Sequence, residues 1–183
     1  LSAQLQGTVA QVEESKDAIV RDEGPAIWRT LWRLLSNRSD VDECFQETFL
    51  AALQYSRSAA IRHWSAFLQR LATARAMDRL RKRYQQRDVT DDSADANAAV
   101  SSRPGPVEQS VAAELSEQLR RALARLPEQQ AESFALYALS GWSYDEIGRQ
   151  LGMSSSNVGV TIHRARLRLR ELLALSSAAI KEG

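Results

Sequence analysis

Residues 141–170 read GWSYDEIGRQLGMSSSNVGVTIHRARLRLR, and this stretch decides the fold of the C-terminal half. Ser143 and Glu146 have the spacing of a capping box, in which the side chain of each residue accepts a hydrogen bond from the backbone amide of the other. Gly152 then offers a left-handed turn that ends the first helix, and Ser154 is a candidate N-cap for a second helix. Two capped helices separated by one glycine turn predict a helix-turn-helix.

The second helix of this pair has one apolar face and one polar face. Its apolar side chains recur at helical spacing and are predicted to pack inward: Val158, Ile162, Ala165 and Leu169. On the other face, Val160 suits a thymine methyl group in the major groove, and the arginines suit phosphates. The residues predicted to contact duplex DNA are Ser155, Ser156, Asn157, Gly159, Val160, His163, Arg164, Arg166 and Arg168. The alternative use of such a motif is a helical hairpin that binds protein.

Composition alone does not predict a nucleic-acid partner, because the formal net charge of the 183 residues is only +1. The distribution of charge is more informative. Residues 62–87 contain eight basic side chains and one acid, whereas 88–95 contain four acids and no base. This asymmetry indicates a basic surface that contacts nucleic acid, followed by an acidic segment.

The residues that carry catalysis or bind metals are scarce. The chain has two histidines, His63 and His163, far apart in sequence, and one cysteine, Cys44, which lies on an apolar helical face and is predicted to be a small core residue. No catalytic motif is present, so we expect no enzyme, no metal and no cofactor. A single cysteine excludes an intramolecular disulfide and fits the reducing cytoplasm. No apolar run approaches the ~18 residues of a membrane span, so no membrane insertion is expected.

Helical periodicity without strand periodicity predicts an all-α fold with two small domains. Helices are expected at 25–35, after a break at Gly24-Pro25, and at 41–53 and 64–83. The predicted organisation is a polar N-terminal segment that forms a frayed helix (1–24), a first helical domain (25–84), a flexible acidic linker (85–106), a second helical domain (107–175) containing the helix-turn-helix (143–170), and a tail (176–183).

The helix expected at 64–83 presents a basic stripe. Arg75, Arg79 and Lys82 stand at i, i+4 and i+7, and so few acids accompany them that phosphate contact is favoured over a solvated face. Trp64, beside His63 at the loop–helix junction, is a candidate for stacking on an unpaired base. The residues predicted to contact DNA in this domain are His63, Trp64, Arg75, Arg79, Lys82 and Arg83.

Three stretches together resemble the bacterial RNA polymerase sigma factors of the extracytoplasmic-function (ECF) group. DVDECFQETFLAAL (40–53) resembles the acidic helix of sigma region 2, and FLQRLATARAMDRLRKR (67–83) resembles the basic helix that follows it. Residues 123–173 resemble region 4 throughout. A lone helix-turn-helix is a weak signal, whereas both halves in this order are a specific one.

The resemblance implies a protein that binds core RNA polymerase and directs it to promoter DNA, without catalysis of its own. The acidic helix would dock on the clamp helices of the β′ subunit through Asp42, Glu43, Gln46 and Glu47. The basic helix and loop 54–63 would engage the downstream (−10) element, and the helix-turn-helix would read the upstream (−35) element. Members of the family are often held by an anti-sigma factor, which is a further expected partner.

Two other classes of protein compete with this interpretation. The first is a stand-alone helix-turn-helix regulator that binds duplex DNA as a dimer, with half-sites one helical turn apart. That scheme has no use for an acidic helix and a separate basic helix. The second is a DNA enzyme anchored by this motif, but the chain contains no candidate catalytic domain.

Overall fold

The computed structural model describes residues 2–90 and 117–181, and every regular element in these ranges is a helix. The helices are α1 (Ser2–Leu35), α2 (Arg38–Ser56), α3 (Trp64–Thr90), α5 (Glu128–Ser140), α6 (Tyr144–Leu151) and α7 (Ser155–Lys181), with a further helical segment at 117–124. The prediction of an all-α fold is confirmed. Of the predicted linker, 85–90 belong to α3, and 91–106 lie outside the described residues, as do 107–116 of the predicted second domain.

α1 runs through Pro25 without interruption, so the predicted break at Gly24-Pro25 is wrong. A proline in a helix interior costs about 3 kcal/mol. Pro25 is exposed, whereas Gly24 is buried, and a Cβ at position 24 would lie 3.4 Å from Cζ of Phe45 on α2. Close packing of α1 on its neighbours therefore outweighs the local preference for a break. The buried apolar residues of α1 are Ile27, Leu31, Leu34 and Leu35.

Both ends of α2 and the C-terminal ends of α3 and α7 differ from the predicted organisation, and α2 ends at Ser56 rather than at 53. α2 begins at Arg38 because the side chain of Asn37 caps it, accepting a hydrogen bond from the amide of Asp40 at 3.2 Å. α3 extends to Thr90, beyond the end predicted at 83, and α7 extends to Lys181, into the segment predicted to be a tail. Neither extension contains glycine or proline. Polar composition alone does not stop a helix, because most polar residues cost only a few tenths of a kcal/mol there.

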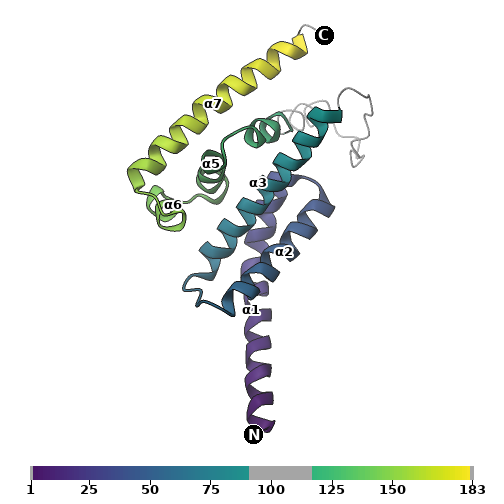
Figure 1. The fold of residues 1–183 in the computed structure, drawn as a ribbon, viewed down its shortest axis with the longest axis vertical. Coiled ribbons are helices and arrows are strands. Elements are labelled where there is room, and N and C mark those ends of the chain that lie inside the picture. Colours follow the sequence, from purple (N-terminus) through teal and green to yellow (C-terminus); the bar gives the residue numbers. More distant parts are fainter. Residues whose placement is uncertain (1, 91–116, 182–183) are drawn as a thin grey trace.

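The two halves of the chain pack against each other. α5 lies between α3 and α7 and contacts both (Figure 1). The main cluster of buried side chains begins in α1, α2 and α3 and continues into the second half through Ala122, Leu123, Leu126, Ala131, Ala135, Ala165 and Leu169. The helix-turn-helix has a small core of its own, formed by Leu136, Ile147, Val158 and Ile162. The two predicted domains thus share buried apolar surface.

The structure also bears on the single cysteine, on membrane-spanning helices and on metal sites. Cys44 is buried, as predicted, and burial raises the pKa of its thiol to about 11. Within 2–90 and 117–181, none of the helices is both long and apolar enough to cross a bilayer. The same residues contain no group of three or more side chains that could hold a metal ion.

Candidate nucleic-acid and protein interfaces

The first helix of the predicted helix-turn-helix, α6, begins with the expected capping box. The amide of Ser143 donates to Oε2 of Glu146 at 2.8 Å, and the amide of Glu146 donates to Oγ of Ser143 at 3.3 Å. The hydroxyl of Ser143 also donates to the carboxylate at 2.6 Å. These side-chain and backbone hydrogen bonds lower the pKa of the Glu146 carboxyl. The start of α6 is therefore fixed by contacts within four residues.

The turn between α6 and α7 depends on two glycines, one of which the sequence analysis missed. Gly152 has φ +66° and ends α6, as predicted. Gly148 is buried, and a Cβ there would lie 2.5 Å from the carbonyl oxygen of Met153. The Met153 amide donates to the carbonyl of Gly148 at 2.9 Å, and the Ser154 hydroxyl then caps α7 as predicted. A glycine in the middle of an otherwise good helix was the signal that could have identified Gly148.

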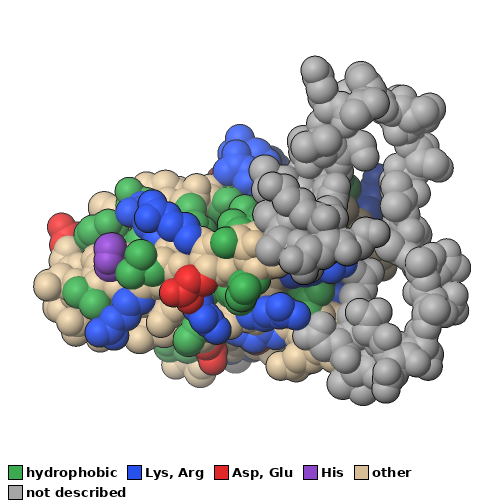
Figure 2. Space-filling view, turned by 90° about the horizontal axis from the view of Figure 1, so that it is seen from above, with side chains coloured by type: hydrophobic (Ala, Val, Ile, Leu, Met, Phe, Trp, Pro, Cys, Tyr) green, Lys and Arg blue, Asp and Glu red, His purple; other side chains and the backbone are tan. Residues whose placement is uncertain are grey.

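α7 presents the predicted faces. Its four predicted core residues are all buried. Most predicted DNA contacts are exposed: Ser156, Asn157, Val160, His163, Arg164, Arg166 and Arg168. Ser155 and Gly159 are half-buried, and a Cβ on Gly159 would lie 3.3 Å from the ring of Tyr144, so this glycine packs against α6. The face of the molecule seen in Figure 2 intersperses basic with apolar side chains and has few acidic ones.

The arginines of α7 differ in their internal partners. The Arg166 guanidinium lies over the ring of Tyr137, 5.0 Å from its centroid. Arg168 pairs with Glu171 at 2.9 Å on the exposed surface. Arg164 is exposed. The contacts of all three with phosphates remain predictions.

In the first half, α2 and α3 carry a charge cluster formed by Asp40, Glu43, Glu47, Arg75 and Arg79. Arg79 lies 3.0 Å from Asp40, 2.6 Å from Glu43 and 4.0 Å from Glu47. Arg75 lies 3.1 Å from Glu47. The sequence-based expectation that the basic stripe has few acidic partners is therefore wrong for Arg75 and Arg79. That expectation considered only the acidic residues on α3 itself. The acids come from α2, which packs alongside.

The other residues predicted on these two helices have different surroundings. Asp42 is half-buried and pairs with Arg38 at 3.6 Å, whereas Gln46 is exposed. Lys82 is exposed. Arg83 has a side chain 25% exposed and lies 4.0 Å from Glu117. One exposed apolar residue on α2, Leu50, was not singled out from sequence; it is 60% exposed.

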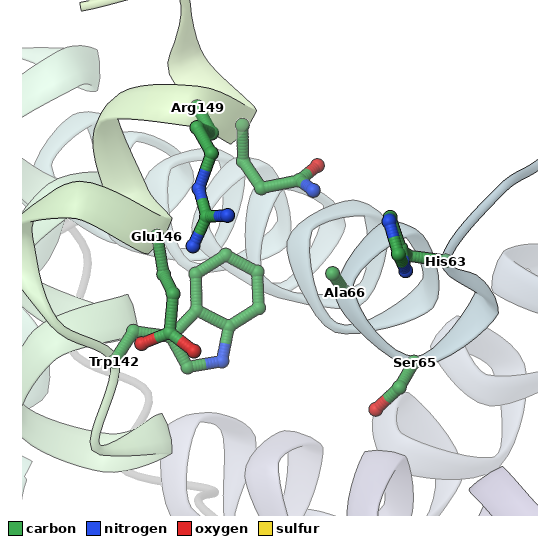
Figure 3. A pocket seen from close by; sticks show the side chains of 7 residues that line it. His63, Ser65, Ala66, Trp142, Glu146 and Arg149 are labelled. Atoms are coloured by element: carbon green, nitrogen blue, oxygen red, sulfur yellow. The ribbon is translucent and has the colours of Figure 1, made fainter.

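The start of α3 faces the helix-turn-helix across a cleft of about 410 Å³. Exposed His63 stands at the helix start, where its carbonyl accepts a hydrogen bond from the Phe67 amide at 3.0 Å. Figure 3 shows His63 on one side of the cleft, and Trp142 and Arg149 on the other. Trp64, the predicted stacking residue, is half-buried and packs against the main core cluster. His63 and Trp64 are therefore brought together at one helix start but in different environments.

Polar contacts add to the shared core between the two halves. Nε2 of Gln69, on α3, donates to the hydroxyls of Thr30 on α1 (2.6 Å) and Ser140 on α5 (2.8 Å). Arg33 donates to the carbonyl of Leu139 at 2.9 Å. Further bridging contacts join Arg120 to the carbonyl of Leu34 (2.9 Å), Tyr84 to Glu117 (2.8 Å) and Arg70 to Glu132 (3.6 Å). Burial, followed by the hydrogen bond to Glu117, raises the pKa of Tyr84 to about 12.

These features define an all-helical protein with a capped helix-turn-helix at one end and an acidic helix paired with a basic one at the other. A model of sigma-70 region 2 matches residues 19–86, and a model of sigma-70 region 4 matches 116–169. The ECF RNA polymerase sigma factor SigM of Mycobacterium tuberculosis is 30% identical over 155 residues, which cover 82% of this chain and 73% of SigM. The chain belongs to the ECF RNA polymerase sigma factors, which confirms the resemblance.

One further relative and one solved structure show how much of each protein this chain matches. SigE, an ECF sigma factor of Mycolicibacterium smegmatis, is 29% identical over 164 residues, and the match covers 90% of this chain but only 63% of SigE. The sigma factor RpoE of Bartonella quintana, solved in complex with the anti-sigma factor NepR, has a TM-score of 0.51 and 21% identity, covering 90% of this chain and 97% of that one. The structural similarity concerns the fold alone.

Proposed function

We propose that this chain binds core RNA polymerase and directs it to a class of promoters. The observation that carries the proposal is that both sigma regions occur in one chain, each with an accessible polar face. The acidic helix α2 exposes Glu43 and Gln46, and α7 exposes the predicted base-reading residues. A DNA-binding module alone would need only the second of these faces.

Each half has a distinct role in the proposal. α2 docks on the β′ clamp helices through Asp42, Glu43, Gln46 and Glu47. The start of α3, with the loop 57–63 that follows α2, engages the downstream element, and the exposed face of α7 enters the major groove of the upstream element. The chain contributes positioning rather than catalysis, acts in the cytoplasm where the polymerase works, and is controlled by an anti-sigma factor.

Promoter binding requires the two halves to separate. The −10 and −35 elements lie roughly 25 base pairs apart, which is about 85 Å of duplex. In this structure the start of α3 and the helix-turn-helix line the same cleft. The compact arrangement therefore represents the chain before it engages both elements, and the separation is compatible with the predicted linker.

The direct test combines the purified chain with core polymerase and a pool of genomic promoter fragments, followed by mapping of transcript starts. We expect a stable complex with core polymerase and starts downstream of one shared pair of elements. A positive charge introduced at an exposed docking position, Gln46→Lys, should weaken the complex. Asp22→Lys, on the exposed surface of α1, should not.

The competing function is a stand-alone dimeric regulator. It predicts that the chain alone protects a palindromic duplex with half-sites one helical turn apart. Protection of that kind, together with no complex with core polymerase, would exclude the sigma-factor function.

A further inference from the structure

The charge cluster on α2 and α3 changes the role expected for Arg79. We propose that Arg79 is a positioning residue of the polymerase-docking face on α2, where it holds Glu43 and Asp40, and that it does not contact DNA phosphates. This inference rests on the proposed function, because it assumes that α2 is the docking helix.

The first argument is the geometry of the guanidinium. Nη1 of Arg79 donates to Oε2 of Glu43 at 2.6 Å and to Oδ1 of Asp40 at 3.0 Å. Nη2 lies 4.0 Å from Oε1 of Glu47. Short hydrogen bonds between charged groups are the strong ones, and the fixed fork of arginine suits several carboxylates at once. One α3 side chain thus contacts three acids spaced over two turns of α2.

The second argument is the local balance of charge. Asp40, Glu43 and Glu47 contribute −3, and Arg75 and Arg79 contribute +2, so the charge cluster has a net charge of −1. A phosphate that approached Arg79 would also approach these carboxylates and be repelled by them. The Arg79 side chain is only 25% exposed. Exposed Lys82, one turn further along α3, is better placed for phosphate contact.

The third argument concerns Glu43. Its side chain is 57% exposed, so it remains accessible to a partner while one carboxylate oxygen is held by Arg79. The hydrogen bond and the charge of Arg79 lower the pKa of the Glu43 carboxyl. A side chain that is already ordered and ionised loses less conformational freedom when a partner binds. Arg79 therefore prepares the docking face without touching the polymerase itself.

The test uses all 183 residues and measures two affinities: that of the chain for core polymerase, and that of the assembled holoenzyme for promoter DNA over a range of salt concentrations. We expect Arg79→Gln to weaken core binding roughly fivefold and to leave the slope of log Kd against log salt unchanged. Lys82→Gln should reduce that slope by about one. Arg21→Gln, an exposed charge on α1, is the control for loss of a positive charge alone.

Two more variants separate positioning from general structural damage. Arg79→Lys keeps the charge but not the fork, and should recover part of the core affinity. In a Glu43→Gln background, the effect of Arg79→Gln on core affinity should largely disappear, because the residue on which Arg79 acts has been neutralised. The urea midpoint of each variant, measured alongside, identifies a general folding defect, which would lower the midpoint together with the core affinity.

The result that overturns the inference is a lower salt slope for Arg79→Gln with unchanged core affinity, which would return Arg79 to the DNA-binding surface. Equal losses in the presence and absence of Glu43 would also overturn it. Failure of the unmodified chain to bind core polymerase would be a different result, because it would refute the proposed function and with it the assumption about α2.

Discussion

The helix-turn-helix and the α2–α3 pair differ in the distance along the chain over which their decisive contacts act. In the helix-turn-helix, the capping box joins Ser143 to Glu146, and the turn joins Gly148 to Met153. In the α2–α3 pair, Arg79 reaches Glu43 and Asp40, which are 36 and 39 positions away. A local contact can be recognised from residue spacing, whereas a contact between helices depends on how those helices pack. This difference explains why the sequence predicted the caps and turn of the helix-turn-helix correctly but did not reveal the acidic partners of Arg79.

The substitution with the largest expected effect on the local contacts of the helix-turn-helix is Gly148→Ala. The added Cβ would meet a backbone oxygen at 2.5 Å, and backbone cannot move aside without opening the turn. We expect a loss of at least about 2 kcal/mol in the free energy of unfolding, together with loss of duplex binding by α7. Urea unfolding monitored by circular dichroism measures the first effect.

Gly159→Ala is the matched control for that change. Its added Cβ would lie 3.3 Å from a side-chain ring atom, which can shift by a few tenths of an ångström. Alanine also favours the helix by about 1 kcal/mol over glycine. We expect a near-neutral effect on stability. Comparable destabilisation by the two variants would mean that the turn does not depend on close approach at Gly148.

The sequence was sufficient for the fold class, the helix-turn-helix, its caps and the buried face of α7, because each rests on spacing within one or two turns of helix. It was not sufficient for the continuity of α1 through Pro25, where packing of Gly24 against Phe45 overrides a local signal. The same limit applies to Arg79, whose acidic partners belong to another helix. The contact between the two halves could not be predicted, since it joins residues such as Gln69 and Ser140 that no motif connects.

The contact between halves is tested by Gln69→Leu, the clearest long-range case. Gln69 is 7% exposed and bonds to a hydroxyl on α1 and another on α5. Leucine keeps most of the volume but leaves both hydroxyls without this partner, for which we expect a loss of about 1–3 kcal/mol. Because α5 would be held less firmly, the radius of gyration from small-angle X-ray scattering should increase.

Gln129→Leu, on the exposed first turn of α5, controls for the change of residue type. It should alter neither the urea midpoint nor the radius of gyration. An unchanged radius of gyration for Gln69→Leu, despite lower stability, would show that the apolar core alone holds the halves together.

The smallest expected effect returns to the capping box, where Glu146→Gln removes the charge and keeps the shape. Folding lowers the pKa of Glu146, mainly through the hydrogen bond from the Ser143 hydroxyl, so the ionised carboxylate stabilises the folded state. That contribution is complete at pH values above the ordinary pKa of 4.5 and is lost as the pH falls through the lower folded value. The difference in urea midpoint between the unmodified chain and Glu146→Gln should therefore be present at pH 7 and shrink as the pH falls below about 4.5.

The Ser143→Ala background tests the cause of this difference. Because the hydrogen bond from the Ser143 hydroxyl is the main cause, the difference between Glu146 and Gln at position 146 should be smaller in that background. A difference that persisted unchanged in that background would mean that Glu146 acts through the backbone amide of residue 143, which also donates to its carboxylate, or through the positive end of the α6 dipole. In that case the contact between neighbouring side chains, recognised from the sequence, would be present in the fold but would contribute little to its stability.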